Sequence, residues 1–391
     1  MGDAPLKLVY VTPALYMAGG VERVLTLKAN YFAEHFGYDI TIILTEEKDK
    51  PLFYPLSDKV KVINLDIGFE KLWNCSLLKK ILIYLPKQRR YKKLLTRELM
   101  RLHPDVTISS LRREINFINN IPDGSKKIGE LHLPRPYFRY LGENACEKVF
   151  SKLWIRLIIS KLKRLDAFVL LSDSARMSWP ELVNTMVIPN PLPFLKQTDN
   201  TAMEKRIIVV GRYSHEKGYD MLLKAWSMLQ DDFIDWRLET FGEGDRTLYE
   251  EILDDLHIHR ERCILHGRTE DVQVEYAKSS FAVCSSRFEG FGLVIIEAMS
   301  CGLPVVSFDC PLGPRSLIED GKNGILVENG NVIQLSAAIR KMMEDEDFRR
   351  KMAIQAKKNS KWYQMENIAE QWKALFAQLM SDRNHSETTL R

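Results

Sequence analysis

The sequence lacks several features that would each point to a particular class of protein. No apolar run approaches the about 20 residues that a membrane-spanning helix needs. No G-x-G-x-x-G or Walker A loop occurs, which argues against a dinucleotide-binding enzyme and against a P-loop NTPase. No signal peptide is expected, because the first apolar stretch is short and contains Pro13. The start MGDAPL lacks the Ser or Thr of a myristoylation motif, so the chain is expected to be soluble or at most peripheral.

Cysteine and histidine are too irregularly placed to indicate a metal site. The six cysteines (75, 146, 263, 284, 301 and 310) show no ligand spacing, and several fall in apolar segments, as reduced core cysteines of a cytosolic protein do. The eight histidines do not pair at ligand spacing. The single D-x-D, Asp345 to Asp347, lies in a charged helical segment rather than at the end of a buried strand, so we interpret it as solvated. No metal and no cofactor are expected.

The charge is balanced overall but unevenly distributed. The 391 residues are 45% hydrophobic and 28% charged, with a net charge of +4, which fits a soluble protein with two domains. Residues 71–101 hold ten Lys or Arg against one acid, Glu98. Residues 148–164 form a second basic segment, in which apolar residues lie between the basic ones. Each segment alone fits a solvated helix face as well as an anionic surface, but the two together favour an anionic membrane surface. No motif for nucleic-acid binding accompanies them.

Strands alternate with helices along the chain, which predicts parallel sheets with helices on both faces. In the first half, strands are expected at 6–11, 40–44, 60–64, 106–109, 127–129 and 167–171, and helices at 21–36 and, except near Pro86, at 72–102. In the second half, strands are expected at 206–210, 236–241, 263–265, 281–284 and 304–308, and helices at 219–229, 271–277, 292–299, 332–344 and 367–379.

A proline-rich, turn-rich stretch separates the two series and predicts an interdomain linker. We expect a first domain over 1–190, a linker over 191–204, a second domain over 205–360, a helical segment over 361–380 and a disordered tail over 381–391. The fold class is therefore α/β, with two Rossmann-like, doubly wound domains that face each other across a cleft. Ligands of such sheets bind beyond the carboxyl ends of the strands.

Glu289 and Glu297 stand eight positions apart in SSRFEGFGLVIIEAMSCGLPVV. A strand leads into a turn that holds the first carboxylate, and a helix that starts near Gly292 holds the second. Helix N-termini attract phosphates, and carboxylates suit sugar hydroxyls, so the segment predicts a site for a phosphate together with a sugar. The structural alternative is that Glu289 caps a turn and that Glu297 is a solvated helix residue. It is disfavoured because the apolar flanks of Glu297 predict a buried carboxylate that needs a partner.

Three further features lie where strands end. Arg212 and Lys217, in VVGRYSHEKG, follow the first strand of the second domain. A guanidinium that donates two parallel hydrogen bonds, together with the point charge of an ammonium, can neutralise a diphosphate there. Gly19 and Gly20 allow either a close backbone approach to a ligand or a plain tight turn. His132 follows a strand and can orient a substrate hydroxyl or shield positive charge, although a lone histidine is more often structural.

Together these segments resemble a GT-B glycosyltransferase of family 4. The second half carries GRYSHEKG, FGEGD, LHGRTEDV, SSRFEGFGLVIIEAMSCGLPVVSFD and LIEDGKNGILV in the family's order, and the first half carries VTPALYMAGGVERV, LLSDSAR and VIPNPL. The start MAGGVERV with SFDCPLGP is similar to the subgroup that builds bacterial capsular and exopolysaccharides. The resemblance implies that the last helix returns to the first domain.

The resemblance also implies roles for single residues. Arg212 and Lys217 would bind the donor diphosphate and stabilise the leaving group, Glu297 would hold the ribose and Glu289 would contact the donor sugar. Gly20 would pack close to the diphosphate and Arg268 would lie near the base. The backbone amides of Phe291, Gly292 and Leu293 would support the sugar and the phosphate. His132 matches the family's acceptor-side histidine only by its place after a strand, since its neighbours GELHLPR differ. The implied catalytic set is Glu289, His132, Arg212 and Lys217.

The implied reaction is transfer of a hexose or N-acetylhexosamine, with retention, from a nucleotide sugar to a lipid-linked or oligosaccharide acceptor. UDP is the expected nucleotide, no metal is required, and the location is cytoplasmic, on the inner face of the cytoplasmic membrane. Two alternatives stay open at this point. One is a GT-B sugar-nucleotide epimerase, and the other is a non-catalytic module that binds a nucleotide or a carbohydrate.

Overall fold

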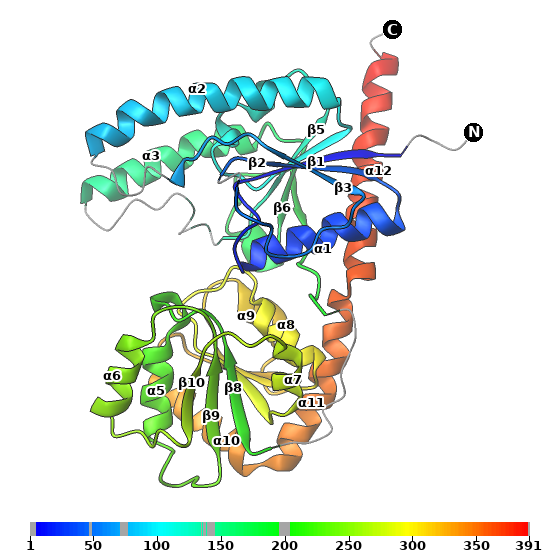
Figure 1. The fold of residues 1–391 in the computed structure, drawn as a ribbon. Coiled ribbons are helices and arrows are strands. Elements are labelled where there is room, and N and C mark those ends of the chain that lie inside the picture. Colours follow the sequence, from blue (N-terminus) through cyan, green and yellow to red (C-terminus); the bar gives the residue numbers. More distant parts are fainter. Residues whose placement is uncertain are drawn as a thin grey trace. The chain divides into compact units, whose positions relative to one another are not determined.

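The chain forms two compact units, each built on its own parallel sheet (Figure 1). The computed structural model describes residues 5–46, 49–70, 77–133, 135, 138, 145–194 and 204–389, and the side chains of 77–81, 145–153 and 383–389 lie outside that description. The first unit comprises Met1–Pro191 and Met365–Arg391, and the second comprises Leu192–Gln364.

The first unit holds a seven-stranded sheet in the order β3-β2-β1-β4-β5-β6-β7, with every neighbouring pair parallel. The strands are β1 (Lys7–Thr12), β2 (Asp39–Leu44), β3 (Val60–Asn64), β4 (Val106–Ser109), β5 (Lys126–Glu130), β6 (Ala167–Leu170) and β7 (Thr185–Val187). Because the strand order reverses between β1 and β4, the loops that follow these two strands diverge at the carboxyl edge, where ligands of doubly wound sheets bind.

Helices cover both faces of this sheet. They are α1 (Gly20–His35), α2 (Leu77–Leu102), α3 (Ala145–Leu162), α4 (Asp173–Met177) and α12 (Met365–Thr389), with 3-10 turns η2 (Glu114–Asn116) and η3 (Ile118–Asn120). Leu8 and Tyr10 of β1 share one core with α1 and α12, whereas Val9 and Val11 share a second core with α2. The alternation follows from the two-residue period of a strand.

Helix α2 continues through Pro86, where the sequence predicted an interruption. A proline removes one intrahelical donor, which leaves the carbonyl of Leu82 without its partner. Both Leu82 and Pro86 are exposed, so water can hydrate that carbonyl and the helix persists. The prediction of a break near Pro86 is therefore wrong.

The second unit holds a six-stranded parallel sheet in the order β10-β9-β8-β11-β12-β13. Its strands are β8 (Arg206–Val210), β9 (Arg237–Phe241), β10 (Cys263–His266), β11 (Phe281–Cys284), β12 (Val305–Phe308) and β13 (Gly324–Val327). Its helices are α5 (Tyr219–Ser227), α6 (Thr247–Asp255), α7 (Val272–Ala277), α8 (Leu293–Ser300), α9 (Gly313–Leu317), α10 (Val332–Glu344) and α11 (Glu346–Ser360), with η5 (His215–Lys217) and η6 (Lys361–Tyr363). In Figure 1, α5 and α6 lie on one side of the sheet and α7 and α8 on the other.

The predicted fold class, α/β with two Rossmann-like parallel-sheet domains, is confirmed. The short edge strands β7 and β13 were not predicted. Of the expected linker 191–204, residues 195–203 lie outside the described residues. Helix α12 belongs to the first unit and runs to Thr389, which replaces the disordered tail predicted from residue 381. No glycine or proline occurs between Met365 and Arg391 to stop the helix.

A buried ion pair joins α1 to the end of β5 inside the first unit. The ammonium of Lys28, whose side chain is 1% exposed, contacts the carboxylate of Glu130, which is 7% exposed. The same ammonium lies 4.5 Å from the centre of the Trp372 ring on α12. Burial alone would raise the pKa of Glu130, but the effects of Lys28 and His132 together outweigh burial and hold that pKa at about 2. The pair therefore stays ionised in the core.

Replacing Lys28 alone is expected to destabilise the protein more than replacing both partners. Lys28→Met leaves the Glu130 carboxylate buried without its counter-charge, which costs about 3–5 kcal/mol. Lys28→Met combined with Glu130→Gln removes both charges and should recover most of that loss, because neither group then needs the other. Urea unfolding of the full chain measures both free energies. A double variant as unstable as Lys28→Met would contradict this account.

Candidate active site

Glycines bring three strand ends of the second unit close together. Gly218 has a φ of +64°, and a Cβ there would lie 2.1 Å from the carbonyl oxygen of Ser285, just after β11. A Cβ on Gly242, after β9, would lie 1.8 Å from the carbonyl oxygen of Gly211, after β8. Only glycine fits such contacts. The loops after β8, β9 and β11 therefore converge at the carboxyl edge of the sheet.

An ion pair between Lys217 and Glu289 forms the centre of this edge. Nζ of Lys217 lies 2.5 Å from Oε1 of Glu289, and the two side chains are 21% and 12% exposed. Ser286 donates a hydrogen bond of 2.7 Å to the same carboxylate oxygen, and Ser285 donates one of 2.9 Å to the carbonyl of Lys217. The structure thus brings together two residues that the sequence places 72 positions apart.

The ion pair keeps Lys217 charged. Burial by itself would lower the pKa of Lys217, but Glu289 and Cys284 together outweigh burial, so that pKa lies above its ordinary value. Arg212 acts in the opposite direction on the same pKa, which shows that the two predicted cations share one region. The side chain of Arg212 is exposed, while its neighbour Tyr213 is buried and donates 2.6 Å to the carbonyl of His266. The backbone that carries Arg212 is therefore anchored.

Helix α8 begins at this same edge. Gly292 precedes it with a φ of +91°, and Leu293 is its first residue. The amide groups of the first turn of a helix are donors without intrahelical partners, and they favour anions. Glu297 lies further along α8 and is 4% exposed, as its apolar flanks predicted. Phe291 is buried, and its ring meets that of Tyr363 edge-on at 5.8 Å.

A strained turn after β12 supports Glu289, and sequence reasoning missed it. Leu312 has φ +79° and ψ −64°, and the amide of Gly313 donates 3.3 Å to the carbonyl of Pro311, which closes a γ-turn. Such turns are rare and strained. Leu312 forms a parallel bridge with Glu289. A Cβ on Gly313 would lie 2.5 Å from the carbonyl oxygen of Phe291. The glycine between two prolines in PLGP was the available signal.

A second missed element is the ion pair between Arg287 and Asp220. The guanidinium donates to both carboxylate oxygens, at 2.9 and 2.7 Å, and also to the carbonyl of His215 at 2.7 Å. Two parallel hydrogen bonds fix orientation as well as distance. The pair ties the loop that carries Glu289 to the start of α5, close to Lys217. It therefore holds the two halves of the central ion pair in register.

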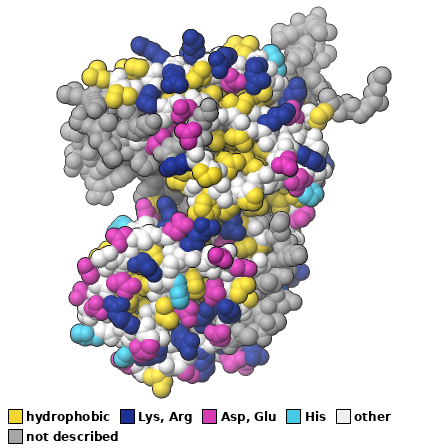
Figure 2. Space-filling view, viewed as in Figure 1, with side chains coloured by type: hydrophobic (Ala, Val, Ile, Leu, Met, Phe, Trp, Pro, Cys, Tyr) yellow, Lys and Arg dark blue, Asp and Glu magenta, His cyan; other side chains and the backbone are white. Residues whose placement is uncertain are grey.

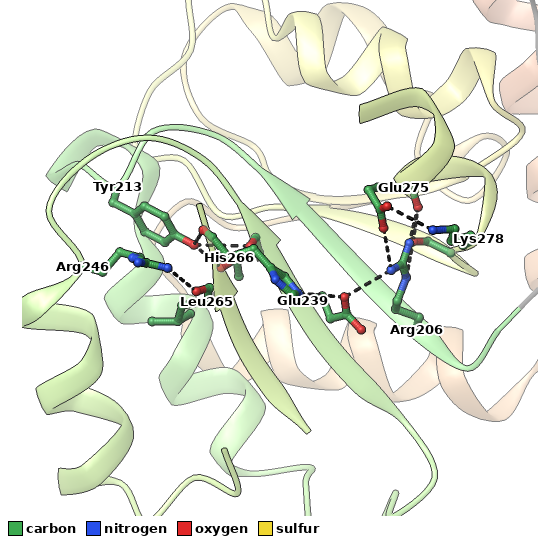
Figure 3. A network of polar contacts seen from close by, with 10 residues as sticks. Arg206, Tyr213, Glu239, Arg246, Leu265, His266, Glu275 and Lys278 are labelled. Atoms are coloured by element: carbon green, nitrogen blue, oxygen red, sulfur yellow. Dashed lines mark hydrogen bonds and ion pairs between the residues drawn. The ribbon is translucent and has the colours of Figure 1, made fainter. Parts of the chain in front are cut away.

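Arg268 lies in the exposed loop after β10, with Nη1 3.5 Å from Oε1 of Glu243. The β9 and β10 strands beneath it are joined by a polar network (Figure 3). The carboxylate of Glu239 accepts a hydrogen bond of 3.2 Å from Arg206 and lies 3.0 Å from Nε2 of His266. The His266 ring stacks on Phe241 at 4.5 Å. This network braces the strands from which the Arg268 loop leaves.

The two remaining predicted residues belong to the first unit. Gly20 is the first residue of α1, after Gly19 in an extended conformation. His132 follows β5 at the carboxyl edge of that sheet, and its Nε2 lies 3.3 Å from Oε1 of Glu130. The roles that the resemblance implies for both residues stay predictions.

No group of His, Cys, Asp or Glu side chains within the described ranges is placed to hold a metal ion. Asp345, from the D-x-D, accepts a hydrogen bond from the amide of Phe348 and caps α11. Such capping is a structural role for the acid that begins the D-x-D.

Comparison with known proteins identifies the family. Residues 194–359 match the family model described as glycosyl transferases group 1. An uncharacterized glycosyltransferase of Haemophilus influenzae is 29% identical over 370 residues, which cover 92% of this chain and 96% of the relative. The chain is a glycosyltransferase whose residues 194–359 match group 1. The match favours a transferase over the epimerase and the non-catalytic module. The α-1,4-N-acetyl-D-galactosaminyltransferase of Campylobacter jejuni is 27% identical and covers 96% of this glycosyltransferase and 99% of its own length.

Solved structures show the same fold as this glycosyltransferase. The sucrose-phosphate synthase of Thermosynechococcus elongatus superposes with a TM-score of 0.78 at 17% identity, over 96% of this chain and 100% of that one. The pneumococcal O-GlcNAc transferase GtfA, crystallised with UDP and GlcNAc, superposes with a TM-score of 0.73 at 14% identity, over 96% and 99%. At these identities the likeness establishes the GT-B fold and not the substrate.

Gly313→Ala is expected to destabilise the glycosyltransferase by about 1–3 kcal/mol, as overpacking does. The added Cβ would overlap the carbonyl oxygen of Phe291 and must push the segment that carries Glu289. Gly267→Ala is the matched control, since a Cβ there meets no atom within 4 Å. Urea unfolding measures both variants. Equal stabilities for the two would show that the turn after β12 does not press on the Glu289 segment.

Proposed function

We propose that this glycosyltransferase moves a hexose or N-acetylhexosamine, with retention, from a UDP-sugar to a lipid-linked or oligosaccharide acceptor in the synthesis of a bacterial surface polysaccharide. The observation that carries the proposal is the Lys217–Glu289 pair beside the start of α8. It combines a cation held charged, a carboxylate and a helix N-terminus in one small region. That set suits a donor made of a diphosphate joined to a sugar.

The names of the relatives support the acceptor class. The Campylobacter jejuni relative is named for an undecaprenol-linked diphosphate acceptor. A second C. jejuni enzyme, also named for a diphospho-undecaprenol acceptor, is 32% identical over 44% of this chain. The amylovoran biosynthesis glycosyltransferase AmsD of Erwinia amylovora is 28% identical over 49%. All three names refer to bacterial glycan assembly, and the UDP bound to GtfA makes UDP-sugars the first donors to test.

The chemistry follows from charge. When the bond between the sugar C1 and the diphosphate oxygen breaks, negative charge grows on the leaving nucleoside diphosphate. Lys217, Arg212 and the amides at Phe291, Gly292 and Leu293 are fixed donors that offset this charge, which is the work a metal ion does elsewhere. The acceptor oxygen forms its bond to C1 on the face that the diphosphate leaves. The proton of the acceptor hydroxyl goes to a diphosphate oxygen.

The two carboxylates have separate tasks in this scheme. Glu297 is buried inside α8 and accepts hydrogen bonds from the ribose hydroxyls. Glu289 lies at the loop end, already holds Lys217 and Ser286, and accepts from a hydroxyl of the transferred sugar. The contact with the ammonium of Lys217 occupies the carboxylate of Glu289 and reduces its nucleophilicity. Glu289 is therefore a binding and charge-positioning group, not a covalent nucleophile of the glycosidase kind.

Lys217→Met is expected to lower kcat by about 10²–10³ for the donor that the unmodified enzyme turns over, because one fixed donor to the leaving group is lost. A panel of UDP-, GDP- and ADP-sugars with detection of released nucleotide identifies that donor. Lys224→Met is the matched control, because Lys224 is an exposed lysine of α5 in the same unit and should leave kcat within about twofold. Retained turnover in Lys217→Met, or no turnover of any donor by the unmodified protein, would refute the proposal.

We also propose that the first unit binds an anionic membrane surface through residues 71–101 and 148–164. In the described part of these segments, Leu82 and Leu85 of α2 and Trp154 and Leu157 of α3 are exposed. Exposed Arg89, Arg90, Lys92 and Lys93 accompany the α2 pair. Figure 2 shows basic and hydrophobic side chains interspersed over α2. None of the described helices is both long and apolar enough to span a bilayer, so any attachment through them is to the surface.

Vesicles that contain phosphatidylglycerol are expected to bind the protein at low salt and to release it as salt rises. Leu82→Glu with Leu85→Glu should weaken binding at least about tenfold, because two apolar side chains can no longer enter the interface. Leu248→Glu with Ile333→Glu is the control, since these side chains of the second unit are equally exposed. Sedimentation with vesicles measures both. Equal binding by the two double variants would exclude α2 as the membrane-binding surface.

A further inference from the structure

His132 lies against a buried charged group that the proposed reaction does not use. Its Nε2 is 3.3 Å from Oε1 of Glu130, and the same oxygen holds the ammonium of Lys28. All three residues lie in the first unit, where β5 ends and α1 crosses it. The centre of the Trp372 ring, on α12, lies 4.5 Å from the same ammonium. The three side chains are largely buried, with 1%, 7% and 12% exposed for Lys28, Glu130 and His132.

The other ring nitrogen of His132 has no partner among the described residues. Nδ1 is buried and makes no hydrogen bond within the part of the chain that the structure describes. A protonated Nδ1 would bury an N–H group without an acceptor, which is costly, whereas an unprotonated Nδ1 buries only a lone pair. A doubly protonated ring has the same drawback. The geometry around Nδ1 therefore favours a neutral ring whose single proton is on Nε2.

Glu130, which lies against Nε2, favours the same tautomer. An ionised carboxylate can only accept, so it favours the proton on the nitrogen that faces it, which is Nε2. Lys28 ensures that Glu130 is ionised, because a carboxylate buried beside an ammonium keeps its charge. Trp372 shields the ammonium from water and leaves Glu130 as its anionic partner. The ion pair thus sets the tautomer of the histidine from inside the core.

We propose that Lys28 and Glu130 are positioning residues for His132, which fix its proton on Nε2 and leave Nδ1 as an unprotonated hydrogen-bond acceptor. That this tautomer serves the reaction rests on the proposed function, whereas the tautomer itself does not. The sequence spacing gives no sign of this arrangement, because Lys28 and Glu130 are 102 positions apart. It also gives a reason for a buried lysine on the core face of α1, where an apolar residue would pack at less cost.

The tautomer is tested on the full chain without any substrate. Protein with 15N-labelled histidine is compared with a His132→Asn sample, which identifies the two ring nitrogens of His132. The expected spectrum has one proton, on Nε2, and an unprotonated Nδ1. A proton on Nδ1, or a ring protonated on both nitrogens at neutral pH, would overturn the proposal. Because this measurement needs no variant in the ion pair, it does not depend on how well such a variant folds.

The role of the ion pair is tested with Lys28→Met combined with Glu130→Gln. The amide of Gln can donate or accept, so the proton should no longer be fixed and the two nitrogen resonances should move toward each other. For the donor found in the sugar-nucleotide panel, kcat should fall about tenfold or more while its KM stays within about twofold. An unchanged tautomer or an unchanged kcat would refute the positioning role.

A matched control lies on the same strand. Lys127 and Asp123 form a second buried ion pair near the other end of β5, with 6% and 0% of their side chains exposed. Lys127→Met with Asp123→Asn removes an equal buried pair and should leave both the His132 spectrum and kcat unchanged. If the unmodified protein releases no nucleotide from any donor, the proposed function fails, and the spectra still decide whether Lys28 and Glu130 set the tautomer.

Discussion

A lysine paired with a glutamate at the carboxyl end of a parallel strand is the interaction on which both candidate sites depend. In the second unit Lys217 and Glu289 join the loops after β8 and β11. In the first unit Lys28 and Glu130 join α1 to β5. A buried charge is tolerated only with a partner, so each pair forces its two segments into one arrangement. The two pairs differ in their surroundings, since the Lys217–Glu289 pair lies at a predicted ligand site and the Lys28–Glu130 pair is buried in the core.

The backbone around Lys217 and Glu289 leaves little freedom for either residue. Gly218 and Gly313 touch carbonyl oxygens that no larger residue would clear, and Leu312 holds a strained turn against Glu289. The two parallel hydrogen bonds from Arg287 to Asp220 also hold the same two loops together. Fixed donors and acceptors reorganise little when charge develops, which is what the departure of a phosphate group requires of a site. Strain at Leu312 is consistent with that demand.

Much of this site could be predicted from the chain. The strand-helix alternation predicted both sheets, and Arg212, Lys217, Glu289 and Gly292 all lie at the carboxyl edge of the second one, as expected. What sequence reasoning missed was contacts between distant segments, such as Arg287 with Asp220. The break expected at Pro86 was wrong for a related reason. Whether a lost hydrogen bond ends a helix depends on whether the freed carbonyl meets water, and only the folded unit shows that.

The sequence by itself determined the fold class and the residue types of the candidate site, because strand and helix periodicities and the motifs at strand ends are local. It also carried enough of the family's segments to indicate a glycosyltransferase. The tertiary structure alone decided the pairings: Lys217 with Glu289, Leu312 with Glu289, and Lys28 with Glu130 and His132. These depend on burial and on distances across the sheet, and no spacing along the chain encodes them.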